Sequence, residues 1–204
     1  MSARNPQDIA QYSNNKNMLI ASDYLKITKN YYGSIHAEKE GNEIEWKQYS
    51  RIRFTLIEHK NKSKQHCMFN LSVDDCRWIF HMISCNVINW TFSREKIVGE
   101  NVSKILIKRQ STDSYGKPRK LPWYIEISNG TGVPEQKGNL NTCKKGTYKE
   151  KTKLYINISD ENFYTFMKRI ERFIEIFETA YSGYIMQQKV KYEEKNKNWQ
   201  GGSM

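Results

Sequence analysis

Two pairs of neighbouring acids are the first candidates for chemistry: Asp74 with Asp75, and Asp160 with Glu161. Paired carboxylates can act as general acid and base. Each pair, however, lies just after a serine and before apolar residues at helical spacing, where acids stabilise the positive end of a helix. The chain has no Gly-x-Ser-x-Gly, His-Glu-x-x-His or Gly-x-x-x-x-Gly-Lys-Ser/Thr motif. We therefore predict structural acids, no enzyme activity and no cofactor.

Histidines and cysteines of the first half are the candidates for metal ligands. They are His59, His66, Cys67, Cys76, His81 and Cys85. Their spacing matches no standard zinc pattern, and only His81 and Cys85 are placed to share one helix face. Cys67 and Cys76 fall on faces expected to be apolar, which favours buried free thiols over a metal site. The absence of a Cys-x-x-Cys pair is typical of reduced thiols in a cytoplasmic protein.

Positive charge combined with aromatic residues predicts a different chemistry, the binding of polyanions. The 204-residue chain has 33 Lys and Arg against 22 Asp and Glu, giving a net charge of +11, together with 13 Tyr and 5 Trp. Such a surplus favours nucleic acid through its long-range field and through counterion release. A lysine-rich proteome would give the same composition without such a partner, so this alternative stays open.

A strand–helix junction that occurs twice indicates the elements that hold these residues. Residues 68–83 align without a gap with residues 155–170. In each segment, apolar residues first alternate as in a strand, then a serine precedes acids, and then apolar residues recur at helical spacing. The serines are Ser72 and Ser159. Two unrelated junctions could coincide, but the shared change of period favours an internal repeat.

Further strands upstream of each junction extend the repeat to a small sheet. The expected strand regions are residues 24–37, 43–58, 104–109, 123–128 and 153–158. We predict an α+β protein with two repeats, each a sheet of three or four antiparallel strands followed by a helix, and the helices packed on each other. The predicted boundaries are a flexible arm at 1–20, the repeats at 21–87 and 88–185, and a flexible tail at 186–204.

The two junctions carry a resemblance to a known group of proteins. Their sequences are Phe-Asn-Leu-Ser-Val-Asp-Asp, residues 69–75, and Ile-Asn-Ile-Ser-Asp-Glu, residues 156–161. With the upstream strands, the chain resembles the single-stranded-DNA-binding transcriptional coactivators, the Whirly family and the Pur-alpha family over residues 24–181. The resemblance implies units of four strands and a helix that pair through their helices, with strands and hairpins binding nucleic acid. The chain lacks the Lys-Gly-Lys-Ala run of plant Whirly proteins and the glycine-rich arm of Pur proteins.

Candidate binding residues are cations and aromatic residues on the polar faces of strands and in basic hairpins. The strand candidates are Trp46, Tyr49, Arg51, Arg53, Lys104, Lys108, Tyr124, Lys153 and Tyr155. The hairpin candidates are Lys60, Lys62, Lys64, Tyr115, Lys117, Arg119, Lys120, Lys144 and Lys145. An aromatic side chain on a strand more often packs in the core than stacks with a base. Trp123 is assigned to the core because it lies on the same face of its strand as Ile125 and Ile127. A single lysine-rich turn is more typical of a solvated loop.

These features predict a protein that binds single-stranded nucleic acid, DNA more than RNA, with low sequence preference, as a homodimer or higher oligomer. No apolar run approaches the roughly 20 residues of a membrane span, and the first residues lack the apolar segment of a secretory signal. We therefore expect a cytoplasmic or nucleoid-associated protein. The alternatives are a protein-interaction module, such as an inhibitor encoded by a mobile element, and a binder of double-stranded RNA or tRNA.

Overall fold

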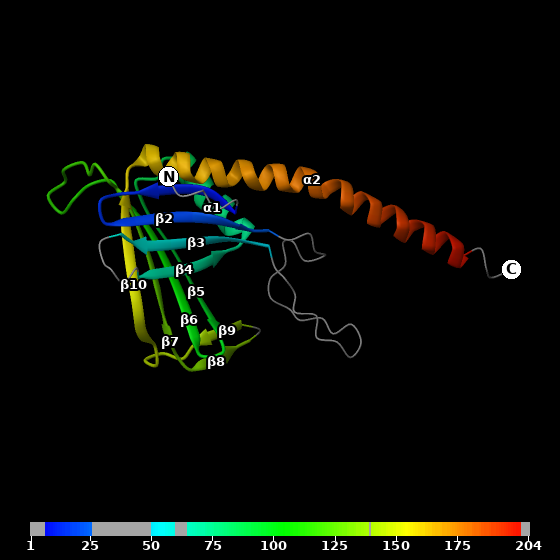
Figure 1. Ribbon diagram of the computed structural model, residues 1–204, viewed down its shortest axis with the longest axis horizontal. Coiled ribbons are helices and arrows are strands. Elements are labelled where there is room, and N and C mark those ends of the chain that lie inside the picture. The colour runs from blue at the N-terminus through cyan, green and yellow to red at the C-terminus, as the bar shows by residue number, and fades with distance from the viewer. Residues whose placement is uncertain (1–6, 26–49, 60–64, 139, 201–204) are drawn as a thin grey trace. The chain divides into compact units, whose positions relative to one another are not determined.

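The computed structural model describes residues 7–25, 50–59, 65–138 and 140–200 (Figure 1). Its first sheet contains β1 (Asp8–Ser13), β2 (Asn17–Tyr24), β3 (Arg51–Glu58) and β4 (His66–Leu71), followed by α1 (Val73–Ser84). Its second sheet contains β5 (Asn89–Val98), β6 (Asn101–Gln110), β7 (Trp123–Thr131) and β10 (Lys149–Ile158), followed by α2 (Asp160–Gln200). A separate ribbon is formed by β8 (Pro134–Lys137) and β9 (Leu140–Cys143).

Both large sheets are four-stranded and antiparallel, in the orders β1-β2-β3-β4 and β10-β7-β6-β5. The prediction of an α+β protein with antiparallel sheets is therefore confirmed. In Figure 1 the strands of the first sheet, blue to cyan, run across those of the second sheet, green to yellow. The chain divides into two compact units, Met1–Glu171 and Arg172–Met204, so that both sheets, α1 and the first turns of α2 belong to the first unit.

The strand–helix junctions form as the residue types predict. Ser72 Oγ accepts a hydrogen bond from the Asp75 backbone N at 3.0 Å, and Asp75 Oδ2 accepts one from Ser72 N at 3.4 Å. This capping box satisfies two N–H groups at the start of α1. At the second junction, Ser159 Oγ accepts a hydrogen bond from Asn162 N at 3.3 Å. Both serines therefore cap their helices, as expected.

The core of the first unit lies where the sheets and helices meet. On β3, Phe54 is buried and packs edge-on against Phe166 of α2, with ring centroids 5.6 Å apart. On β7, Trp123 is buried against Phe163 of α2 at 4.8 Å, which confirms its assignment to the core. The two helices also contact each other directly, because Phe80 of α1 lies 5.7 Å from the ring of Tyr164.

A side-chain amide joins the two sheets. Asn129 on β7 accepts a hydrogen bond from the backbone N of Met68 at 2.8 Å and donates one to the carbonyl of Met68 at 2.9 Å. It also donates to Ser103 Oγ at 3.0 Å. Since β4 is an edge strand of its sheet, Asn129 pairs backbone groups that no neighbouring strand reaches. We call this contact the edge clamp.

The β8–β9 ribbon lies in the chain between β7 and β10, in a region where the sequence predicts no strand. Cys143 N donates a hydrogen bond to Glu95 Oε1 at 2.9 Å, which ties the ribbon to β5. A Cβ atom on Gly132 would lie 2.3 Å from Cys143 Sγ, so the close approach of β9 requires glycine at this position. The sequence signal was weak because both strands are short and polar.

Two predicted boundaries do not hold. Residues 8–20, expected in a flexible arm, form β1 and the start of β2, in which Ala10 and Leu19 are fully buried. Residues 186–200, expected in a flexible tail, continue α2, consistent with the high helix propensity of Lys, Glu and Gln. Most of the strand predicted at residues 24–37 lies outside the described residues. No helix in the described part of the chain is long and apolar enough to cross a membrane.

Candidate nucleic-acid interface

One face of the second sheet carries five of the predicted binding residues. In the register of the sheet, Lys108 pairs with Tyr124, and Tyr155 and Lys153 pair with Glu126 and Ser128. Lys104 also pairs with Ser128. All of these side chains have the opposite parity to the buried isoleucines of β6 and β7. We call this surface the outer face, and it contains Lys104, Lys108, Tyr124, Lys153 and Tyr155.

Two tyrosines stack on the outer face. The rings of Tyr124 and Tyr155 have centroids 5.4 Å apart and are inclined by 28°. Tyr155 is 47% exposed. The hydroxyl of Tyr124 donates a hydrogen bond to Glu126 Oε2, and burial together with this carboxylate raises the pKa of Tyr124 well above its ordinary value. Tyr124 is therefore neutral at physiological pH and presents an uncharged aromatic surface.

Two of the three outer-face lysines are paired with carboxylates. Lys104 Nζ lies 2.8 Å from Glu95 Oε2, and it also lies 4.1 Å from the centre of the Tyr148 ring. Lys153 Nζ lies 3.1 Å from Glu126 Oε1, a hydrogen bond that raises the pKa of Lys153. These charges are partly compensated before any ligand arrives, because each lysine already pairs with a carboxylate.

Lys108 differs from the other two lysines. Among the described residues its side chain has no hydrogen-bond or ion-pair partner. It lies beside Tyr124 in the register of the sheet and close to the end of β6. This arrangement leaves an ammonium group without a described partner next to the stacked tyrosines, where it can contact a phosphate.

The hairpin between β6 and β7 adds further cations at this end of the sheet. Asp113 Oδ1 accepts hydrogen bonds from the backbone N of Tyr115 at 2.8 Å and of Lys117 at 2.9 Å. Gly116 has a φ of 77°, which glycine adopts without strain. The turn is therefore ordered by its own residues and leaves Tyr115 87% exposed. Its exposed cations are Lys117, Arg119 and Lys120.

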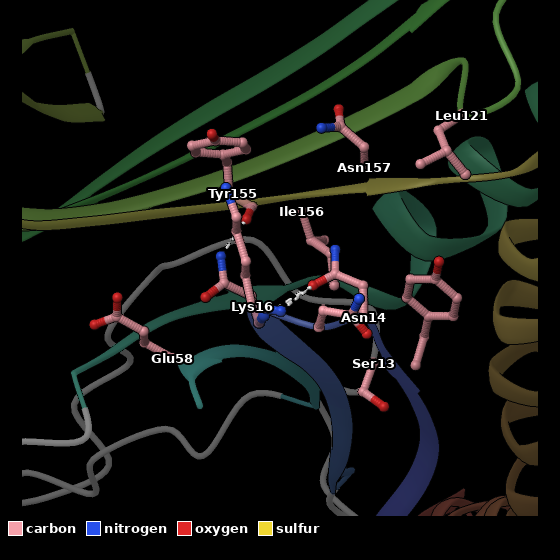
Figure 2. Close-up of a pocket in the computed structure, with 11 residues that line it drawn as sticks. Ser13, Asn14, Lys16, Glu58, Leu121, Tyr155, Ile156 and Asn157 are labelled. Carbon is pink, nitrogen blue, oxygen red and sulfur yellow. Dashed lines mark hydrogen bonds between the residues drawn. The ribbon is translucent and has the colours of Figure 1, made fainter. Parts of the chain in front are cut away.

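A groove of about 900 Å³ lies along the free edge of β10 (Figure 2). Its lining comes from the end of β1, the β1–β2 turn, the end of β3, the β6–β7 hairpin and β10. The lining residues are Tyr12, Ser13, Asn14, Asn15, Lys16, Asn17, Glu58, Leu121, Tyr155, Ile156 and Asn157. Asn17 Nδ2 donates a hydrogen bond to the Tyr155 carbonyl at 2.6 Å and so fixes the turn beside β10. We call this the edge groove.

Of the residues that line the edge groove, only Tyr155 is among the predicted binding residues. The β1–β2 turn was interpreted as part of a flexible arm because Asn14, Asn15, Lys16 and Asn17 are all polar. Asn14 Oδ1 accepts hydrogen bonds from the backbone N of Lys16 and of Asn17, each at 2.9 Å. The run of asparagines was in fact the signal of an Asx turn between two strands.

Other predicted residues lie apart from the outer face. Arg51 and Arg53 are on β3 of the first sheet, where Arg53 covers the Tyr24 ring at 3.9 Å and donates to Asn70 Oδ1 at 2.9 Å. Lys144 and Lys145 follow β9 and lie beyond the C-terminal end of β7, whereas the β6–β7 hairpin lies at its N-terminal end. Trp46, Tyr49, Lys60, Lys62 and Lys64 lie outside the described residues. The structure therefore unites only part of the predicted site.

The candidate metal ligands are dispersed. Cys67 and Cys76 are buried in the core, and burial raises the pKa of Cys67 to about 11 and that of Cys76 well above its ordinary value. Both are therefore protonated thiols at neutral pH. His81 and Cys85 lie close together, with Nε2 and Sγ 3.5 Å apart. Within residues that the structure describes, no group of three or more His, Cys, Asp or Glu side chains is placed to hold a metal ion.

Comparison with known proteins gives no assignment. No protein-family model matches the chain, and no curated protein matches its sequence. The geometry itself provides stacked aromatic rings, an unpaired lysine, a basic hairpin and a polar groove at one end of one sheet. Such an arrangement suits the binding of a chain of phosphates that carries flat aromatic groups.

Proposed function

We propose that this protein binds single-stranded nucleic acid, DNA in preference to RNA, with little sequence preference. The observation that carries the proposal is the stack of Tyr124 on Tyr155, with Lys108 beside Tyr124 and the basic β6–β7 hairpin close by. Base–aromatic stacking contributes about 1–3 kcal/mol per base and accepts any base, because every base has a π face. Lysines that contact phosphates add affinity through counterion release.

The preference for DNA follows from the resemblance to the Whirly and Pur-alpha group. That resemblance implied units of four strands followed by a helix, and two four-stranded antiparallel sheets, each followed by a helix, are compatible with it. We propose membership of this group on the same grounds, with the β8–β9 ribbon as an addition to the second unit. We also propose that two chains pair, because the resemblance implies that units of strands and a helix associate through their helices.

A protein-interaction module is the second candidate function. Within the unit Arg172–Met204, four large apolar side chains among those that the structure describes on α2 are at least 44% exposed. They are Ile176, Tyr184, Met186 and Val190. Exposed apolar side chains on one helix favour contact with another protein or with a second copy of this chain. This observation supports oligomerisation and the rival function equally.

Fluorescence anisotropy with labelled oligo-dT over a series of salt concentrations tests the nucleic-acid proposal. We expect the logarithm of the association constant to fall linearly with the logarithm of the salt concentration. Lys108→Gln should weaken binding and reduce this slope by about one phosphate contact. Lys137→Gln on β8, where Lys137 pairs with Glu135 at 3.2 Å, is the matched control and should change neither.

The result decides between the candidate functions. Competition by unlabelled single-stranded DNA, duplex DNA and single-stranded RNA should rank the single-stranded DNA first. Undetectable binding to oligo-dT at low salt, or binding without a salt slope, would show the proposal to be wrong and leave the interaction module. Stronger competition by duplex RNA would instead indicate a binder of double-stranded RNA.

A further inference from the structure

Tyr155 lies at the boundary between the outer face and the edge groove. Tyr155 belongs to β10, which is the edge strand of the second sheet. Tyr124 on the neighbouring strand β7 covers one side of its ring, and Tyr155 lines the edge groove whereas Tyr124 does not. In Figure 2, Tyr155 and Asn157 project from the same side of β10, and Asn14 belongs to the turn beside that strand. A ring stacked on the side of Tyr155 that Tyr124 does not cover would therefore lie at the edge of the sheet, beside the groove.

We propose that the edge groove binds one unstacked base of the single strand, stacked on Tyr155 and hydrogen-bonded by the amides of Asn15 and Asn157. This inference rests on the proposed function and adds a base-binding site to it. A volume of about 900 Å³ lies within the range of about 300–1,000 Å³ that small-molecule sites span. The groove is therefore large enough for a base with its sugar.

The composition of the groove selects a base over a phosphate. Among the residues that the structure describes, its lining contains one cation, Lys16, and one carboxylate, Glu58, whose formal charges cancel. Leu121 and Ile156 add apolar surface against which a flat ring can pack. A phosphate would gain little net attraction here, whereas the hairpin cations nearby supply it. We therefore expect the groove to bind the base and the cations of the β6–β7 hairpin to bind the phosphate backbone.

Amide side chains suit the edges of the bases. Each asparagine amide has two donor hydrogens and an acceptor oxygen, and can pair with any base edge that presents both kinds of group. Neither Asn15 nor Asn157 has a side-chain hydrogen bond to another described residue. Both amides are therefore available, while Asn14 and Asn17 are occupied in holding the turn.

Binding of two oligomers by two alanine variants tests the inference. The probes are oligo-dT and an abasic oligomer of the same length, which has the same phosphates and no bases. The variants are Asn15→Ala and Asn157→Ala, singly and together, with Asn101→Ala at the exposed start of β6 as the matched control. Thermal unfolding of each variant verifies that the fold is kept, and Asn15→Ala alters only an exposed side chain of a turn.

The double variant should bind oligo-dT about ten-fold more weakly, the effect of losing two or so modest hydrogen bonds. Its salt slope and its affinity for the abasic oligomer should equal those of the wild type. Unchanged oligo-dT affinity in the double variant would reject the groove while leaving the proposed function intact. An equal loss for both oligomers would show that the groove contacts the backbone instead, and overturn the inference. Absence of oligo-dT binding by the wild type would reject the proposed function and the groove together.

Discussion

Arg109 at the end of β6 and Asp160 at the start of α2 form a bidentate ion pair that joins the second sheet to its helix. Arg109 Nε lies 2.9 Å from Asp160 Oδ1, and Nη2 lies 3.0 Å from Oδ2. Arg109 is 7% exposed, and it also donates hydrogen bonds to Asn86 Oδ1 at 2.9 Å and to the Val87 carbonyl. Trp123 Nε1 donates to Asp160 at 2.7 Å. Asp160 was predicted only to stabilise the positive end of a helix. In the structure it also binds Arg109 and Trp123, and so has a more specific role.

Asp160→Asn should lower the free energy of unfolding by about 2 kcal/mol, because it leaves the buried guanidinium without its counter-charge. The loss is smaller than for a fully buried pair because the Asp160 side chain is half exposed. Urea unfolding followed by tryptophan fluorescence measures it. Asp74→Asn, which alters another exposed acid in the first turn of a helix, is the control and should cost less than about 0.5 kcal/mol. Equal losses in the two variants would contradict the role assigned to the ion pair.

Lys96 should make stability increase with pH above neutrality. Burial, reinforced by the positive charge of Arg51, lowers the pKa of Lys96 to about 8 in the folded protein. The unfolded value is about 10.4. Between these values the unfolded chain binds more protons than the folded one, so the free energy of unfolding contributed by this group rises with pH.

The measurement compares the wild type with Lys96→Met by urea unfolding at a series of pH values from 7 to about 10. The difference in free energy of unfolding between wild type and variant should increase in favour of the wild type over this range. Taking the difference removes the contribution of other groups that titrate in both proteins. A difference that is constant with pH would show that Lys96 has an ordinary pKa.

Asn129→Ala should destabilise the protein by about 2 kcal/mol, because it leaves the N–H and carbonyl of Met68 without partners at a partly buried strand edge. Thermal unfolding at a fixed scan rate detects the change. Asn89→Ala, at an exposed position at the start of β5, is the control and should have little effect. Asn129→Asp should also be destabilising, since a carboxylate cannot donate to the Met68 carbonyl.

Tyr155→Ala should weaken the binding of oligo-dT about ten-fold, from the loss of roughly one stacked base. Tyr155→Phe keeps the ring and should bind as the wild type does, because the Tyr155 hydroxyl makes no hydrogen bond to another described residue. Fluorescence anisotropy at one salt concentration is sufficient for both. A loss in the Phe variant as large as in the Ala variant would assign the effect to the hydroxyl and not to stacking.

The sequence predicted best those features that depend on local chemistry. The serine caps at Ser72 and Ser159, the alternation around Phe54 and the core position of Trp123 all follow from nearest neighbours and periodicity. The strands β1 and β2 were missed because their buried residues include two alanines, Ala10 and Ala21, which give a weak alternating signal.

The candidate site was less predictable because it depends on contacts between residues far apart in the chain. The parity of β6 and β7 placed Lys108 and Tyr124 on one face, but nothing in the sequence indicated that Glu95 and Glu126 would pair with Lys104 and Lys153. The edge groove brings the β1–β2 turn to β10, across more than half of the chain. Arg109 was likewise overlooked, since its position on a strand gave no sign that Asp160, 51 residues later, would pair with it.

The edge clamp cannot form until late in synthesis, because it needs Asn129 of β7 as well as Met68 of β4. All strands of the first sheet precede residue 72, so this sheet can emerge complete while Asn129 is still unsynthesised. During that interval the backbone of β4 has an uncovered side, the kind of edge that pairs with other chains. Translation of β7 ends the exposure. The nascent protein is thus exposed to aggregation once the strands of its first sheet, which end at Leu71, have been made, and a pause in translation between β4 and β7 would lengthen that period.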